Sequence, residues 1–440
     1  MGTAHVHAGW SREDPHQAVV PPIHTASAYA HSSHAALKDL FARRRDGFAY
    51  ARSGNPTTAV LEERITALEG GIGAIAVSSG QAATTIALAA LLAPGTHLVA
   101  SRRLYGGTTE FLDDTLADLG VVTTTVDPWD LGAWEKAIRP ETRAVLVEAI
   151  ANPGAQLVDL PAIARIAHAY GVVVIVDSTL ASPALLRPGD LGADVVVHSA
   201  TKYLAGHGSV IAGLIVDTGV FDPRRDPARW PRLVGHNRRF NVDFSAEYAR
   251  GGSGLLAYAR AKYVTDLGAT LSAHSAHTVL LGIETLDLRM RAISDTAREL
   301  ATWLAAQPGV ATVHHPSIPG RPDGQLAERF FPRGTAGVFA IDLDGGEEAA
   351  AAFCDAAQLF TLAVNVGDVR SLLCHPATTT HSHLTPGQQD ACGVGPGTIR
   401  LSIGLEDRED LRTDLRAALG AARALSSSAR GLSRVASAPS

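Results

Sequence analysis

The sequence predicts an α/β protein in which a mostly parallel sheet, covered by helices on both faces, is followed by a smaller α+β domain. Short apolar runs alternate with amphipathic helical segments between residues 74 and 215, as in doubly wound sheets. The chain has 440 residues, of which 46% are hydrophobic, so it can bury more than one core. Its 42 glycines suit the many tight strand-to-helix turns of this class.

The predicted elements of the sheet follow in chain order. A helix is expected over 56–70, because its apolar residues recur at helical spacing up to a glycine. Strands are expected over 74–78, 97–100, 121–126, 143–148, 172–177, 194–198 and 210–215. The helices between them are expected over 81–92, 108–119, 131–138 and 160–170. Residues 48–282 therefore form the sheet domain.

The remaining segments have different characters. Residues 1–47 are mixed in composition and predict an extended N-terminal arm with short helices. The arginine-rich stretch within 220–260 predicts a solvated loop. The second domain, over 283–425, begins with a helical region at 283–305. Its other elements are strands near 311–314, 337–342, 360–363 and 398–403 and helices over 347–357 and 408–424. The small and polar tail, 426–440, is expected to be disordered.

Composition excludes several classes of function. A formal net charge of −6 gives no reason to expect nucleic acid or an anionic membrane as a partner. The three cysteines form no CxxC pair, so a zinc site or a disulfide framework is not expected and a reducing cytoplasm is the predicted compartment. The N-terminus carries no secretory pattern, and no stretch approaches the roughly 20 apolar residues that span a bilayer. Metal ligation by the 18 histidines is not expected either.

Two charged residues follow neighbouring apolar strands. Asp177 ends the run VVVIVD, and Lys202 follows the next strand together with Ser199 and Thr201. Sites collect at the carboxyl ends of parallel strands. A lysine that can form a Schiff base, beside a carboxylate that can pair with a ring nitrogen, is what pyridoxal phosphate chemistry needs. Taken alone, the two residues fit a helix-capping aspartate and a surface lysine better than a cofactor site.

A candidate phosphate site lies upstream, in VSSGQAAT at 77–84. Gly80 follows a strand and opens a helix, so free backbone amides at the positive end of the helix dipole can receive a phosphate. A tight turn that merely requires glycine is the alternative. The run GIGAIA at 71–76 matches a dinucleotide fingerprint, but it precedes a strand, which disfavours a nicotinamide enzyme.

Several segments together carry a family resemblance over about residues 5–425. They are YARSGNPTTAVLEERITALEGG, VSSGQAAT, LYGGT, VDST, HSATKYLAGHG, NVGDVRSLLCHPATTTH and TIRLSIGLEDREDL. The chain resembles the Cys/Met-metabolism family of pyridoxal phosphate enzymes, which have fold type I. The resemblance implies pyridoxal 5′-phosphate as cofactor and a homotetramer, a dimer of dimers with shared active sites.

By position, the resemblance also implies the roles of individual residues. Lys202 resembles the Schiff-base lysine and proton shuttle, Asp177 the partner of the pyridinium nitrogen, and Tyr105 the ring that stacks on the cofactor. The implied phosphate cup is Gly80, Gln81, Ser199 and Thr201, completed by Tyr50 and Arg52 reaching over from the neighbouring subunit.

The substrate carboxylate is implied to bind Arg400, helped by Ser371 and Asn152. A planar guanidinium suits a bidentate carboxylate clamp.

The finer motifs look most like the O-acetylhomoserine sulfhydrylase branch, which implies γ-replacement by sulfide or a thiol. Gly107 stands where methionine γ-lyases usually have a cysteine. Ser178 and Ala292 depart from the branch pattern, in place of an asparagine and a histidine. A specialised γ-synthase or γ-lyase acting on an unusual amino acid therefore stays open. A catalytically silent scaffold is not expected, since every implied catalytic residue is present.

Overall fold

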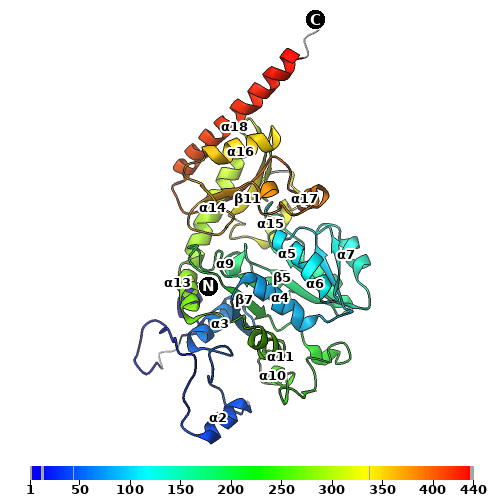
Figure 1. Ribbon diagram of the computed structural model, residues 1–440, viewed down its shortest axis with the longest axis vertical. Helices are drawn as coiled ribbons and strands as arrows, with labels where there is room; N and C mark the ends of the chain where they lie inside the picture. The colour runs from blue at the N-terminus through cyan, green and yellow to red at the C-terminus, as the bar shows by residue number, and fades with distance from the viewer. Residues whose placement is uncertain (1, 11–13, 43, 336, 437–440) are drawn as a thin grey trace.

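The structure, a computed structural model, describes residues 2–10, 14–42, 44–335 and 337–436, with side chains through residue 425. It confirms the predicted fold class. A seven-stranded sheet with helices on both faces is joined to a smaller five-stranded sheet domain (Figure 1).

The large sheet has the strand order β1-β7-β6-β5-β4-β2-β3. All neighbours pair in parallel except β7, which is antiparallel to both β1 and β6. Its strands are β1 (Gly73–Val77), β2 (His97–Ser101), β3 (Val122–Val126), β4 (Thr142–Glu148), β5 (Val173–Asp177), β6 (Val195–Ser199) and β7 (Gly213–Asp217). The carboxyl ends of β2, β4, β5 and β6 therefore meet at one edge of the sheet.

Alternate residues of the central strands enter two different cores. In β5, Val174 and Val176 pack with α3 (Pro56–Glu69) and α8 (Leu160–Ala169) on one face. Val173 and Ile175 pack with α4 (Gly80–Leu91) on the other face. Burial on both faces explains the continuous apolar runs of the sequence. The other helical segments of this region are α5 (Gly106–Glu110), η1 (Phe111–Thr115), α6 (Leu116–Asp118), α7 (Leu131–Ala137), α9 (Ser182–Leu185) and η2 (Pro188–Leu191).

The segment expected to be a solvated loop, within 220–260, instead packs on the second face of the sheet. Phe221, Trp230 and Phe244 are buried in the same core as α4. Arg229 donates to the Thr142 carbonyl and Arg232 to the Leu92 carbonyl, so the arginines bind backbone at the sheet periphery. Its elements are short: η3 (Pro223–Arg225), β8 (His236–Asn237), β9 (Val242–Asp243), α10 (Ala246–Ala249), α11 (Gly254–Ala259), η4 (Arg260–Val264) and α12 (Thr265–Leu267).

The smaller domain is built on the strand order β10-β11-β14-β13-β12. The helical region expected from residue 283 is two helices that break at Thr285, α13 (Ala273–Glu284) and α14 (Leu286–Ala305). The strands are β10 (Val310–His314), β11 (Val338–Leu343), β12 (Thr361–Leu362), β13 (Leu372–Cys374) and β14 (Thr398–Ser402). The other helices are α15 (Gly324–Phe330), α16 (Gly346–Ala356), η5 (Pro376–Thr378), α17 (Pro386–Cys392) and α18 (Arg408–Ala436).

The C-terminal helix α18 and the part of the N-terminal arm that carries α2 extend from the body of the molecule, whereas α1 packs on it against α3 and α13 (Figure 1). The backbone of α18 stays helical through Ala436, into the segment for which disorder was expected, because no proline interrupts it before Pro439. Residues 437–440 lie outside the described part. At the other end, the arm carries α1 (Gly2–His7) and α2 (His34–Phe41), and its Val19 and Phe41 side chains are exposed. No helix among the described residues is long and apolar enough to cross a membrane.

Candidate active site

A cavity of about 1020 Å³ lies at the carboxyl edge of the large sheet, where the smaller domain meets it. Nine of the predicted site residues line this cavity: Gly80, Gln81, Tyr105, Asn152, Asp177, Ser199, Thr201, Lys202 and Arg400. They come from six separate segments of the chain, so the fold brings together what the sequence only suggested. Ser371, Tyr50 and Arg52 do not line it.

The N-terminus of α4 forms one end of the cavity. Ser79 caps the helix, its Oγ accepting the Ala82 amide at 3.0 Å, while the amides of the first turn have no partner within the helix. Gly80 lets the start of the helix pack directly on Ser199, because an added Cβ would lie only 2.5 Å from the Ser199 Cβ. The Thr201 hydroxyl, on the same side, accepts the Ala212 amide at 3.0 Å. The cradle has the donors and the dipole to receive a phosphate.

The floor of the cavity holds two carboxylates on neighbouring strands. Asp177 and Glu148 end β5 and β4 and are direct partners in the sheet. Burial raises the pKa of Asp177, whose Oδ1 accepts the Thr179 amide at 2.9 Å. Burial first, and then the charge of Asp177, raise the pKa of Glu148. A carboxylate that is buried away from water favours a cation beside it.

Lys202 and Arg400 share one neighbour, Asn365. The Lys202 Nζ donates to the Asn365 Oδ1 at 2.5 Å, and the Arg400 guanidinium donates to the Asn365 carbonyl at 3.1 Å. Burial, and then the charge of Arg400, lower the pKa of Lys202 from 10.5 to about 8. The amine is therefore far easier to obtain in its neutral, nucleophilic form than an exposed lysine. Arg400 itself is only 2% exposed and lines the cavity.

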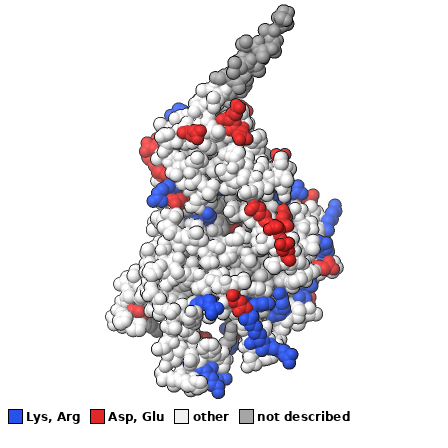
Figure 2. All heavy atoms as spheres, in the orientation of Figure 1, with Lys and Arg blue, Asp and Glu red and all other residues white. Residues whose placement is uncertain are grey.

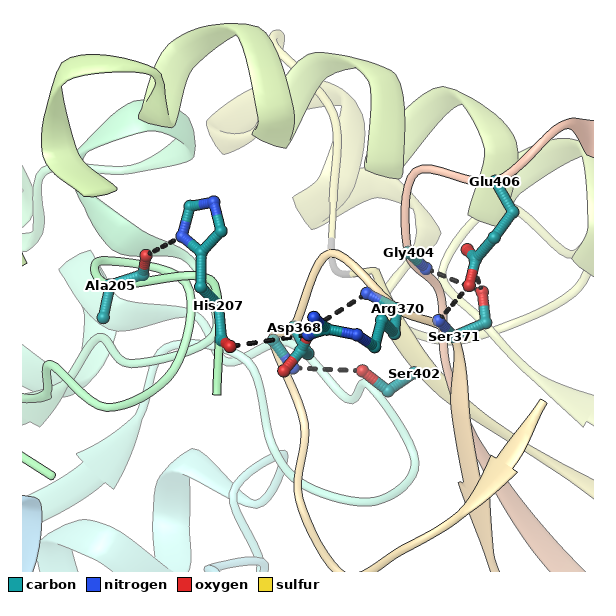
Figure 3. Close-up of polar contacts among 9 residues, drawn as sticks. Ala205, His207, Asp368, Arg370, Ser371, Ser402, Gly404 and Glu406 are labelled. Atoms are coloured by element: carbon teal, nitrogen blue, oxygen red, sulfur yellow. Dashed lines mark hydrogen bonds and ion pairs between the residues drawn. The ribbon is translucent and has the colours of Figure 1, made fainter. Parts of the chain in front are cut away.

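Ser371 is not brought to the cavity. Its hydroxyl donates to Glu406 Oε2 at 2.8 Å and accepts the Gly404 amide at 2.9 Å, and its own amide donates to Glu406 Oε1 at 2.6 Å. Figure 3 shows Ser371 turned toward Glu406. A contact of the Ser371 hydroxyl with a substrate carboxylate would require its bonds to Glu406 and Gly404 to break. Asn365, to which the sequence motifs assigned no role, instead contacts both Lys202 and Arg400.

Tyr50 and Arg52 also lie outside the cavity, next to the N-terminal arm. The Arg52 guanidinium donates to the Thr265 carbonyl at 2.6 Å, and its Cζ lies 5.6 Å from the centroid of the Tyr50 ring. Tyr50 is 49% exposed. Within one chain these two residues do not reach the phosphate cradle.

One wall of the cavity mouth is acidic. Glu110, Asp113 and Asp114 are exposed on consecutive turns of α5 and η1 and line the cavity. Figure 2 shows acidic side chains gathered over this part of the molecule. Across the mouth, Gln388 of α17 donates to Asp113 at 3.5 Å. The i, i+3, i+4 spacing of the acids was visible in the sequence, but which surface they face was not.

The donor set fits pyridoxal 5′-phosphate. The cradle at Gly80 suits the phosphate, Asp177 suits a protonated ring nitrogen, and Lys202 offers a primary amine in the same cavity. Among the described residues no group of three or more His, Cys, Asp or Glu side chains could hold a metal ion. The arrangement can bind a carboxylate through Arg400 and move protons through the Lys202 Nζ.

Comparisons with known proteins agree with this geometry. A family model described as Cys/Met metabolism PLP-dependent enzyme matches residues 2–420. The O-acetyl-L-homoserine sulfhydrylase of Leptospira meyeri is 37% identical over 423 residues, which are 95% of this chain and 96% of the relative. The L-methionine gamma-lyase of Pseudomonas putida is 37% identical over 422 residues, 96% of this chain and 97% of the relative.

A solved structure is similar over almost its whole length. It belongs to a Campylobacter jejuni protein assigned as an O-acetylhomoserine (thiol)-lyase and contains a pyridoxyl-lysine phosphate. The TM-score is 0.91 at 32% sequence identity, covering 95% of this chain and 99% of that one.

Proposed function

Because the chain belongs to the Cys/Met metabolism family of PLP-dependent enzymes, we propose that it catalyses γ-replacement on an O-activated homoserine. In this reaction O-acetyl-L-homoserine and sulfide or a thiol give homocysteine or methionine, and acetate is released. The observation that carries the proposal is the cavity in which Lys202, Asp177 and Arg400 converge, in a chain related along its length to O-acetylhomoserine sulfhydrylases.

Four groups of residues would hold the cofactor. Gly80, Gln81, Ser199 and Thr201 would bind its phosphate, Asp177 its ring nitrogen, Tyr105 its ring face and Lys202 its aldehyde carbon. When bound, pyridoxal phosphate supplies an electron sink for removal of protons from the carbons next to the amino group. The side chains of the protein supply the other parts of the reaction.

The chain supplies substrate binding and proton transfer. The buried Arg400 binds the substrate carboxylate, with the Asn152 side chain on the same cavity surface. The Lys202 Nζ accepts and returns protons, since its lowered pKa keeps a usable fraction of the amine neutral. Asn365 holds that amine in place from one side. The low exposure of these groups strengthens each electrostatic interaction.

The assembly and location belong to the same proposal. We infer a dimer of dimers in which Tyr50 and Arg52 of each chain complete the phosphate cradle of its neighbour, consistent with their place beside an extended arm. The arm is then residues 1–47, the cofactor domain 48–282 and the C-terminal domain 283–425. A cytoplasmic location is supported by the three cysteines, all of which are free and buried.

A specialised γ-synthase or γ-lyase is the second candidate, and the acidic wall favours it. Hydrosulfide is an anion, so Glu110, Asp113 and Asp114 at the cavity mouth oppose its entry. A neutral or cationic nucleophile meets no such barrier.

Product analysis by mass spectrometry tests the proposal. The purified, cofactor-loaded protein is mixed with O-acetyl-L-homoserine, with and without sulfide. Homocysteine that forms only when sulfide is present supports γ-replacement. 2-Oxobutyrate and ammonia in both mixtures would identify a γ-lyase, and no turnover in either would overturn the assignment of O-acetyl-L-homoserine as the substrate.

Neutralising the acidic wall tests whether it opposes the entry of hydrosulfide. We expect the triple variant E110Q/D113N/D114N to lower the KM for hydrosulfide about 3- to 10-fold at low ionic strength, because like-charge repulsion is removed. The gain should shrink at salt on the order of 1 M. Asp118→Asn, on α6 but away from the cavity lining, is the control. An unchanged KM would contradict an electrostatic role for the wall.

A further inference from the structure

Glu148 is the second carboxylate on the cavity floor, and the proposed function gives it no part. It ends β4 beside Asp177 and is only 6% exposed. Both of its oxygens accept backbone amides: Oε1 accepts the Tyr105 amide at 2.6 Å, and Oε2 accepts the Asn152 amide at 3.1 Å. A buried carboxylate with two charge-assisted bonds is strongly fixed, and so are its donors.

The two donors belong to different loops. Tyr105 precedes α5, in the loop after β2, and Asn152 lies in the loop after β4. One carboxylate therefore ties together two loops that both line the cavity. The strand between them, β4, is central and buried, which makes Glu148 a rigid anchor.

The Tyr105 ring has little else to hold it. It is 45% exposed, and in the described part of the chain its hydroxyl makes no hydrogen bond. On one side the ring lies over Gly107, where an added Cβ would come within 2.7 Å of the Tyr105 Cε1. The direction of the ring is thus set largely by its backbone, and the Glu148 carboxylate fixes that backbone.

We propose that Glu148 is a positioning residue that, through two backbone amides, aims the Tyr105 ring at the bound cofactor and holds Asn152 at the substrate side. The inference rests on the proposed function for the identity of the cofactor and the site. Burial and the charge of Asp177 raise the pKa of Glu148, and the hydrogen bonds from the Tyr105 and Asn152 amides offset part of that shift. Asp177 faces it from β5, and the cationic side chains of Lys202 and Arg400 line the same cavity.

A double-mutant cycle in the holoenzyme tests this role. Glu148→Gln keeps the shape, but its amide nitrogen cannot accept, so one backbone amide loses its partner. We expect kcat to fall about 10-fold or more, since displacements near 1 Å are costly in active sites. In a Tyr105→Ala background the same change should cost about threefold or less, because the ring through which Glu148 acts is gone. Glu141→Gln, exposed just before β4, is the matched control.

A second readout needs no substrate. The visible circular dichroism of bound pyridoxal 5′-phosphate reports the placement of the ring beside it, and we expect Glu148→Gln, but not Glu141→Gln, to change it. Glu148→Asp keeps the charge and should restore part of the signal and of kcat. Additive effects in the cycle, an unchanged spectrum, or an aspartate variant no better than the glutamine variant would each overturn the proposal. Absent turnover with a changed spectrum would instead count against the proposed substrate alone.

Discussion

Replacing Lys202 by methionine should stabilise the cofactor-free protein at neutral pH. The Lys202 pKa falls from 10.5 to about 8 through burial and the charge of Arg400. At about 1.4 kcal/mol for each pKa unit, the charged ammonium destabilises the folded state by about 3 kcal/mol. Methionine has a similar length and no charge, but it leaves the Asn365 Oδ1 without its donor, which costs about 1 kcal/mol. The net gain at pH 7 is therefore about 2 kcal/mol.

The difference in stability between the parent and the Lys202→Met variant depends on pH. The folded protein disfavours the protonated amine, so the penalty is fully present below pH 8. It is relieved as the pH rises from 8 to 10.5, because the native state has then already lost the proton that the unfolded chain still holds. The advantage of the variant should thus disappear over this interval.

Urea unfolding of the cofactor-free proteins, followed from pH 7 to pH 10.5, measures the effect. The control is Lys136→Met, which removes an exposed lysine and should show no such pH-dependent gain. Two results would refute the reasoning that burial and the charge of Arg400 disfavour the protonated amine. One is a Lys202→Met protein that is less stable than the parent at pH 7. The other is a difference in the free energy of unfolding that does not change with pH.

Two further substitutions examine the ends of the cavity. Gly80→Ala should weaken pyridoxal phosphate binding at least about 10-fold, because its Cβ would meet Ser199 in the cradle. Titration followed by absorbance measures the affinity, and Gly387→Ala, with nothing near its added Cβ, is the control. Equal affinities of the two variants would contradict a phosphate cradle at Gly80. Arg400→Lys should lower kcat/KM about 100-fold, because lysine cannot bind the substrate carboxylate in a bidentate way. Arg370→Lys changes an exposed arginine and should leave kcat/KM unchanged. Steady-state kinetics that give both variants the same kcat/KM would contradict the clamp.

Much of the site could be predicted because its residues lie in short contiguous motifs. Lys202 with Ser199 and Thr201, and Gly80 with Gln81, sit directly after apolar strands, and the strand ends of a doubly wound sheet are where ligands bind. Their convergence follows from the fold alone.

Other features depend on register between distant segments, which one sequence does not display. Glu148 reads as the last residue of a strand, and only its pairing with Asp177 places it on the cavity floor. Ser371 was expected at the substrate, but it precedes the short strand β13 and turns to Glu406, on a segment that follows β14.

The direction of β7 and the packing of the 220–260 segment were likewise hidden. An apolar run does not say whether a strand runs parallel or antiparallel to its neighbours, and the arginines of 220–260 concealed the few aromatic anchors that bury it.

Mapping the lysine that holds the cofactor tests whether Lys202 is the residue that binds the aldehyde carbon of pyridoxal 5′-phosphate. The chain contains only four lysines, Lys38, Lys136, Lys202 and Lys262, so a peptide map is unambiguous. The protein is loaded with pyridoxal 5′-phosphate, reduced with borohydride, digested and analysed by mass spectrometry. We expect a phosphopyridoxyl group on the peptide that contains Lys202, and none on the peptides that contain the other three lysines. Modification of another lysine with Lys202 left free would contradict it.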